Sequence, residues 1–155
     1  MRIALYQPDI AQNVGTILRL GACLAVPVDI IEPCGFPFGE ATMKRAALDY
    51  LDQASFIRHE SWAAYLAANP GRLVLMTTKA NLAYTTFAFS PSDTILMGRE
   101  SAGVPAEVAE RADMSLKIPM QPGTRSLNVA VATAMVLGEA LRQTELFPAP
   151  AGAPA

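Results

Sequence analysis

The sequence predicts an α/β fold, a mostly parallel sheet with helices on both faces. Short apolar runs alternate along the chain with segments in which apolar residues recur at helical spacing, as in strands joined by crossover helices. The alternation continues without a repeat or an internal boundary over 155 residues, a length that suits one domain. Parallel strands joined in this way are covered on both faces.

Turn residues separate the elements of the first half. Pro8 and Asp9 end the first apolar run, and residues 32–40 form a loop rich in proline and glycine. The expected elements are, in order, a strand over 2–6, a helix from Asn13 to Ala25, a strand over 28–31, a short helix over 41–48, the segment 54–59 and a helix around 61–68.

The second half ends in the longest helix. Pro105 is expected at a helix start, where its missing N–H leaves no bond unmade, and residues 147–155 have no core-forming pattern and are expected to be disordered. The other expected elements are a strand over 72–78, a strand over 94–98, a helix over 105–112, a strand over 115–119 and a helix over 126–143.

Composition narrows the class of protein. A hydrophobic content of 52% with 17% charged residues is typical of a folded globular chain, and no apolar run is long enough to cross a membrane. Two cysteines and one histidine predict neither a disulfide framework nor a metal site, and they favour a cytoplasmic protein. A net charge of −2 argues against a protein that coats nucleic acid, although it leaves room for a local basic patch.

Polar residues gather in the loops that follow the predicted strands. Ligands of parallel sheets bind at this edge, so these loops are the expected site. They carry Asn13, Arg19, Lys79, Arg99, Glu100, Arg125, Ser126 and Asn128. No dinucleotide-binding GxGxxG follows the first strand, and no GxxxxGK[ST] phosphate loop is present, which argues against a Rossmann dehydrogenase and a P-loop NTPase.

Several residues are expected to have a structural role, and for Asn128 a functional one is also open. Residues 126–141 are apolar or small almost all round, so this helix should be buried in the domain or in an oligomer interface. Asn128 in its first turn is either a capping residue or a functional one, and the sequence leaves both open. Trp62 and Tyr65 are expected to be packing anchors, and Cys23 a core residue.

Three segments resemble the sequence motifs of the SpoU branch of the SPOUT methyltransferases. They are QNVGTILR (12–19), LMGRESAGVP (96–105) and IPMQPGTRSLNVAVATAMVLGEALRQ (118–143), in the family's order and spacing. Two further features narrow the resemblance: the stretch LYQPDIAQNVG and the lack of an added N-terminal RNA-binding domain. Both are typical of the subgroup that methylates the wobble cytidine or uridine of tRNA.

The resemblance implies a single SPOUT-type methyltransferase domain over 1–146, with a deep trefoil knot in its C-terminal part. It implies a homodimer that binds the anticodon loop of tRNA, in leucine isoacceptors, and no membrane. It also implies S-adenosylmethionine as the methyl donor, without a metal. By motif position, the residues that bind the donor are Met76, Thr77, Gly98, Glu100, Ile118, Met120, Ser126 and Leu127.

The resemblance places the catalytic positions at Asn13, Arg19, Glu100, Ser126 and Asn128. Methyl transfer to a ribose 2′-hydroxyl needs that oxygen positioned and its developing charge stabilised. A guanidinium rarely gives up its proton, so Arg19 is expected to stabilise this charge and hold a phosphate, with Glu100 orienting it. Ser126 and Asn128 are expected to fix the knot loop and reach the ribose.

Three alternatives remain at this point. The enzyme could methylate another tRNA or rRNA nucleotide, the chain could be a non-catalytic RNA-binding module, or it could be an unrelated α/β nucleotide-binding enzyme. RNA binding predicts a basic groove, formed by Arg19, Lys44, Arg45, Arg99 and Arg125, although Arg99 and Arg125 could equally be ordinary surface charges. Gly138 departs from some members of the subgroup, which carry tyrosine there, so contacts made by that ring are absent here or are supplied by another residue.

Overall fold

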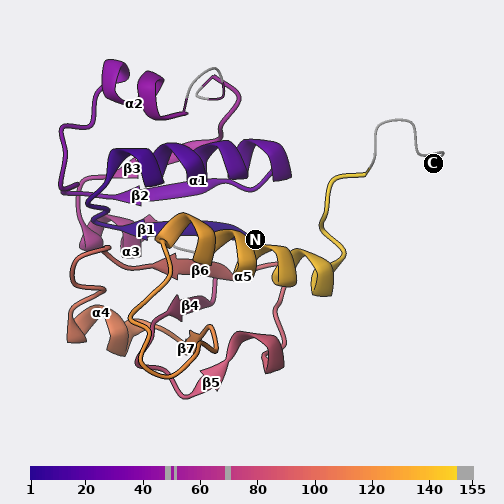
Figure 1. The fold of residues 1–155 in the computed structure, drawn as a ribbon. Helices are drawn as coiled ribbons and strands as arrows, with labels where there is room; N and C mark the ends of the chain where they lie inside the picture. Colours follow the sequence, from indigo (N-terminus) through magenta and orange to yellow (C-terminus); the bar gives the residue numbers. More distant parts are fainter. Residues whose placement is uncertain (48–49, 51, 69–70, 150–155) are drawn as a thin grey trace.

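The structure, a computed structural model, describes residues 1–47, 50, 52–68 and 71–149. A seven-stranded sheet forms its centre, and all of its strand pairs are parallel (Figure 1). The strand order is β3-β2-β1-β6-β4-β7-β5, so the chain first builds one side of the sheet outward from β1 and then the other. The predicted α/β class with a parallel sheet is confirmed.

The element bounds follow the predicted order closely. The strands are β1 (Arg2–Tyr6), β2 (Val28–Ile31), β3 (Phe56–His59), β4 (Leu73–Met76), β5 (Leu82–Ala83), β6 (Thr94–Met97) and β7 (Met114–Lys117). The helices are α1 (Ala11–Leu24), α2 (Glu40–Ala47), α3 (Trp62–Ala68), α4 (Ala106–Arg111) and α5 (Val129–Thr144), with a 3-10 turn η2 (Tyr84–Thr86). Among these described elements, none is a helix long and apolar enough to span a bilayer.

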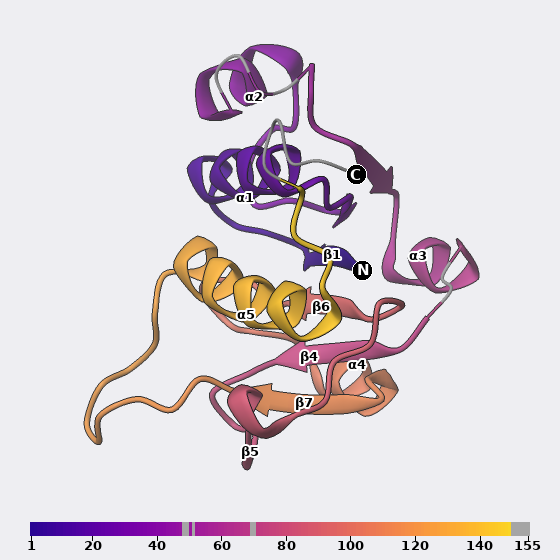
Figure 2. The same cartoon turned by 90° about the vertical axis from the view of Figure 1, so that its right-hand side faces the viewer.

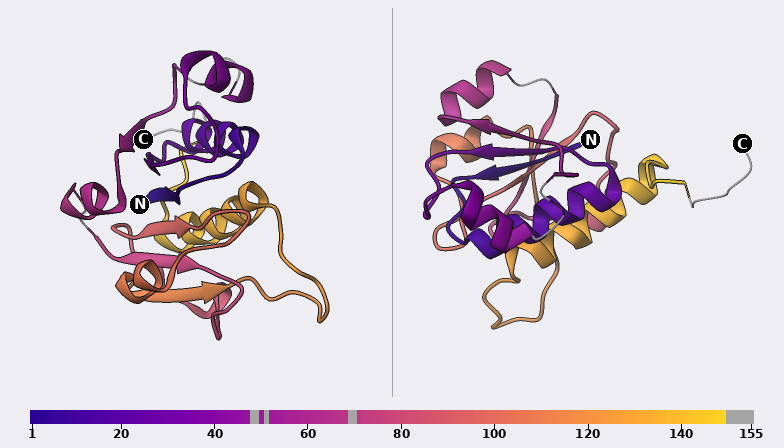
Figure 3. Two further views of the ribbon diagram at one scale, coloured as in Figure 1. Left: turned by 90° about the vertical axis from the view of Figure 1, so that its left-hand side faces the viewer. Right: turned by 90° about the horizontal axis from the view of Figure 1, so that it is seen from above.

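Helices cover both faces of the sheet (Figures 2 and 3). Alternate side chains of β1, such as Ile3 and Leu5, face α1 and α5 in the larger core. The side chains between them, such as Ala4 and Tyr6, face α3 and α4 in a smaller core that contains Tyr65 and Val108. The predicted packing role of Tyr65 is confirmed, because it is buried and stacks on Trp62.

Helix α5 begins three residues later than predicted. Asn128 is its N-cap, and the Asn128 side-chain oxygen accepts hydrogen bonds from the N–H groups of Ala130 and Val131. Residues 126–128 therefore lie before the helix, at the end of the long loop that leaves β7 (Figure 2). Because residues 126–128 are not helical, they extend the loop after β7, and they lie near the carboxyl ends of β4 and β6.

Two other expectations differ from the structure in detail. Strand β5 and turn η2 were not predicted, because β5 has only two residues and Leu82 is 40% exposed, which leaves no apolar run to detect. Cys23 is exposed rather than in the core. Helix α5 is buried in the domain on one side, whereas Val131 and Met135 on its other side are exposed in the single chain, so its expected burial in the domain or in an oligomer interface is met within the chain on one side only. Of the predicted tail, residues 147–149 are exposed and outside any helix or strand, and 150–155 lie beyond the described residues.

Candidate functional site

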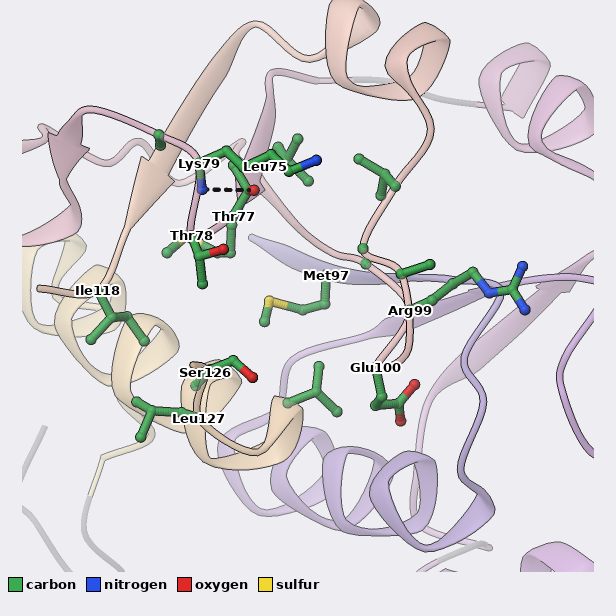
Figure 4. Close-up of a pocket in the computed structure, with 18 of the residues that line it drawn as sticks. Leu75, Thr77, Thr78, Lys79, Met97, Arg99, Glu100, Ile118, Ser126 and Leu127 are labelled. Atoms are coloured by element: carbon green, nitrogen blue, oxygen red, sulfur yellow. Dashed lines mark hydrogen bonds between the residues drawn. The ribbon is translucent and has the colours of Figure 1, made fainter. Parts of the chain in front are cut away.

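A cavity of about 870 Å³ opens at the carboxyl edge of the sheet. Its floor is apolar, with Leu75 and Met76 at the end of β4 and Met97 at the end of β6. The loops after β4, β6 and β7 form its walls. Figure 4 shows Ser126 and Leu127 on the side of the cavity opposite Lys79 and Thr77. The cavity thus lies where a parallel sheet is expected to bind a ligand.

All eight residues predicted to bind the donor line this one cavity. They come from four separate segments of the chain and are Met76, Thr77, Gly98, Glu100, Ile118, Met120, Ser126 and Leu127. Of the predicted catalytic residues, Asn13, Glu100, Ser126 and Asn128 also line it. The cavity combines apolar side chains, small residues and a few polar groups, which suits a nucleoside with a charged tail.

The loop after β6 folds back on itself at two glycines. Arg99 and Gly103 exchange two backbone hydrogen bonds of 2.9 Å, and Gly103 has a φ of +66°, a region that L side chains rarely adopt. A Cβ on Gly98 would lie 2.7 Å from the carbonyl carbon of Gly103. Gly98 is thus required by the fold of the loop itself, and the loop presents its backbone to the cavity.

Glu100, Asn13 and Asn128 form a chain of hydrogen bonds beside the cavity. The Asn13 amide donates to the Glu100 carboxylate at 3.0 Å, and the Asn128 amide donates to the Asn13 oxygen at 2.9 Å. Asn128 also caps α5, so the structural and functional interpretations of this residue both fit its geometry. The chain joins three segments that are far apart in sequence, and it fixes the direction of each polar side chain.

Asp9 also belongs to this site, although the sequence suggested only a turn residue. Its carboxylate accepts hydrogen bonds from Ser101 and Arg99, and its N–H donates to Glu100 at 2.8 Å. The hydrogen bond from the Ser101 hydroxyl is the main reason why the pKa of Asp9 lies below its usual value. Nothing in the spacing of Asp9 and Ser101 reveals this contact, because 92 residues separate them.

Arg19 is the exception among the predicted catalytic residues. It is exposed, its guanidinium lies 4.6 Å from the centre of the Tyr50 ring, and it is not among the described residues that line the cavity. Glu100 bonds to Asp9 and Asn13, so the expectation that Glu100 orients Arg19 is wrong within one chain. The reason is geometric: Arg19 lies six residues after Asn13 on α1, which turns it about 120° away around the helix.

Other charged and nucleophilic groups stand apart from this arrangement. Arg99 pairs with Asp9, and Arg125 lies on the cavity wall. The Lys44 side chain lies outside what the structure describes. Burial, above all, raises the pKa of Cys34 to about 11, so its thiol is a poor nucleophile at neutral pH. The described residues contain no cluster of three or more metal-ligating side chains.

The chain is similar to known methyltransferases along nearly its whole length. The model of the SpoU rRNA Methylase family matches residues 1–138. A protein of Beijerinckia indica, 58% identical over 91% of this chain and 90% of its own, is named tRNA (cytidine(34)-2'-O)-methyltransferase. A protein of Escherichia coli K12 has the same name and is 38% identical over 92% of this chain and 93% of its own.

Solved structures share the fold. One that concerns the 2-OH methylation of C/U34 on tRNA has a TM-score of 0.87 and 40% identity, and covers 92% of this chain and 94% of its own. An AdoMet-bound rRNA methyltransferase from Sinorhizobium meliloti has a TM-score of 0.80 and 27% identity, over 91% of this chain and 55% of its own.

Proposed function

The chain belongs to the SpoU rRNA methylase family, and we propose that it methylates the ribose 2′-hydroxyl of the wobble nucleotide of tRNA. It is an S-adenosylmethionine-dependent methyltransferase, and the nucleotide it modifies is cytidine or modified uridine. The observation that carries this proposal is the 58% identity to a tRNA (cytidine(34)-2'-O)-methyltransferase over 91% of the chain. We further propose leucine isoacceptors as the substrates and the cytoplasm as the location.

The cavity fits the methyl donor in size and chemistry. Apolar side chains of Met76, Met97 and Ile118 can pack against an adenine ring, and the close-packed backbone of the loop 98–103 offers peptide groups to its polar edge. Arg125 and Lys79 on the cavity wall can neutralise a carboxylate. When bound, S-adenosylmethionine supplies an electrophilic methyl group.

The residues around the cavity have to position the nucleophile and stabilise its charge. In-line displacement needs the ribose oxygen held opposite the departing sulfur, so alignment contributes a large part of the acceleration. Asn13 and Asn128 are held rigidly by their hydrogen bonds beside the cavity, and we assign them and Ser126 to orienting the ribose. Glu100 keeps Asn13 in place through a charge-assisted bond.

Arg19 reaches this site only if it comes from a second copy of the chain. The rim of the cavity carries the exposed apolar residues Ile10 and Leu127, and Val131 and Met135 continue them along α5. Such a patch favours a protein partner. We propose a homodimer through this face, in which Arg19 of one protomer stabilises the developing oxyanion in the cavity of the other.

The remaining family features are proposed for this chain as well. We assign residues 1–146 to one methyltransferase domain and propose that the long loop before α5 takes part in a deep trefoil knot. In support, α5 returns from that loop to pack against both α1 and β6. A knot shortens the chain length gained on mechanical unfolding, so single-molecule stretching from the two ends tests it.

The substrate is tested by incubating tRNA with the enzyme and methyl donor. We expect mass spectrometry of nuclease fragments to show one added methyl group on the wobble nucleotide of leucine tRNAs. Unstacked anticodon bases and an accessible 2′-hydroxyl make this loop easier to read than an A-form helix. Methylation confined to the D-loop or to ribosomal RNA would retain the enzyme class and refute the substrate. Binding of RNA without any transfer would favour a non-catalytic module.

A further inference from the structure

The Asp9 carboxylate joins the turn after β1 to the loop after β6. One of its oxygens accepts from the Ser101 hydroxyl at 2.6 Å and from the Ser101 N–H at 3.0 Å. The other accepts from the Arg99 guanidinium at 3.1 and 3.3 Å. The Asp9 N–H donates in turn to Glu100. One residue thus holds three consecutive residues of a loop that lines the cavity.

The turn itself is built to hold Asp9 in this place. Gln7 has a φ of +44°, an unusual value for a residue other than glycine, and its N–H donates to Ile31 at the end of β2. On the other side, Gly35 packs so closely that a Cβ there would lie 2.9 Å from the Asp9 Cα. Strained backbone that its surroundings enforce is concentrated at functional sites. The backbone of Asp9 is therefore fixed by its packing against Gly35, while its carboxylate faces the loop after β6.

The loop has few attachments besides Asp9: Glu100 accepts from Asn13, and Val104 packs against the smaller core. Ser101, Ala102 and Gly103 are exposed, so burial of apolar surface contributes little to fixing their position. The two backbone bonds between Arg99 and Gly103 close the loop on itself without attaching it to the sheet. The charge-assisted bonds from Arg99 and Ser101 to Asp9 are stronger than neutral ones, and together with the bond between Glu100 and Asn13 they attach the loop to the rest of the domain.

We propose that Asp9 is a positioning residue for the methyl donor: its carboxylate keeps the loop 98–103 in the shape that binds S-adenosylmethionine. This inference rests on the proposed function. Asp9 acts through Ser101 and Arg99, and its removal leaves the buried core of the domain intact. Donor affinity should therefore fall much more than the stability of the fold.

The decisive variant is Asp9→Asn, which keeps the shape of the side chain and removes two acceptor positions. By calorimetry we expect S-adenosylhomocysteine to bind about tenfold or more weakly, the scale expected for losing hydrogen bonds to a charged group. The melting temperature should change little. In kinetics, the KM for the methyl donor should rise more than kcat falls, and Asp9→Glu should restore part of the affinity.

The chain offers a matched control in Asp93. Its carboxylate likewise accepts two bonds from an arginine, Arg72, and one from a backbone N–H, that of Ser90, far from the cavity. Asp93→Asn should lower the melting temperature and leave the affinity for S-adenosylhomocysteine unchanged. Equal losses of affinity in both variants would show that Asp9 acts only through general stability, and would overturn the proposal.

A second variant covers the case in which Asp9→Asn does not fold. Ser101→Ala removes one of the bonds to Asp9 from an exposed residue, and we expect several-fold weaker binding. Unchanged affinity in Ser101→Ala, or in a folded Asp9→Asn, overturns the role of Asp9. If the wild-type protein itself does not bind S-adenosylhomocysteine, the proposed function fails instead, so the two failures are distinguishable.

Discussion

At the scale of single residues, the site depends on places where the chain passes close to itself. Gly98 leaves room for the backbone of Gly103, and Gly35 leaves room for Asp9. Neither glycine contributes a side chain to the cavity. Each lets two backbone segments come within contact distance, and this closeness sets the shape of the wall that faces the ligand.

Gly98→Ala should abolish donor binding by distorting the loop. The added Cβ would lie 2.7 Å from backbone carbon of Gly103, which cannot move aside like a flexible side chain. We expect calorimetry to detect no binding of S-adenosylhomocysteine. Gly39→Ala is the control, because a Cβ there meets nothing within 4 Å. Wild-type affinity in Gly98→Ala would show that the loop adjusts without loss.

At the scale of elements, the start of α5 links stability to the site. The Asn128 oxygen caps the helix, while the Asn128 amide donates to Asn13. One side chain therefore satisfies the free N–H groups of the last helix and orients the polar chain that continues to Glu100. The helix start and the site thus share one side chain.

The two roles of Asn128 can be separated by substitution. Asn128→Ala should cost about 1 kcal/mol of folding stability through the lost cap, and should reduce kcat by freeing Asn13. Asn128→Ser retains a capping oxygen but has no amide, so it should unfold at nearly the wild-type urea concentration while kcat still falls. If Asn128→Ser had wild-type kcat, the bond to Asn13 would have no part in turnover.

At the scale of the whole molecule, the proposed site draws on two chains. The cavity, Glu100, Asn13 and Asn128 come from a single chain, whereas Arg19 faces away from them. The exposed apolar side chains of Val131 and Met135 lie on the helix that borders the cavity. A partner on this face would cover them and complete the site in one step.

Mixed dimers should test this arrangement. Arg19→Ala alone should bind S-adenosylhomocysteine normally and lose most turnover, and Gly98→Ala alone should also be inactive. When the two variants are mixed and allowed to exchange protomers, the sample should regain about one quarter of wild-type activity. About half of the dimers then contain one chain of each variant, and each of these mixed dimers has one complete site out of two. No recovery after verified exchange would mean that Arg19 does not act across the interface.

Met135→Glu supplies the control for assembly. Sedimentation should show a dimer for the wild type and a monomer for this variant. When Met135→Glu is added to the Arg19→Ala or the Gly98→Ala chain, the mixture of the two chains should not recover activity, because mixed dimers cannot form. Ile57→Glu places the same charge at another exposed apolar residue, on the edge strand β3, and should leave the dimer intact. A wild-type monomer at micromolar concentration would contradict the proposed interface.

Much of the fold followed from local patterns. The strands over 2–6, 28–31, 72–78, 94–98 and 115–119 were expected within two residues of their ends, because buried parallel strands are apolar runs between turn residues. Strand β5 escaped because two half-exposed residues carry no such pattern. The eight positions predicted to bind the donor came from the family resemblance rather than from periodicity, and the structure brings them to one cavity.

The sequence by itself determined the α/β class, the order of the elements and the loops that hold the site, since these depend on hydrophobic spacing and turn residues along a short stretch. Only the tertiary structure decided that Asp9 holds Ser101, that Glu100 binds Asn13 rather than Arg19, and that Arg19 faces outward. The physical reason is that a hydrogen bond depends on distance and direction in space. Residues some 90 positions apart acquire these only when β1 and β6 pair side by side in the sheet.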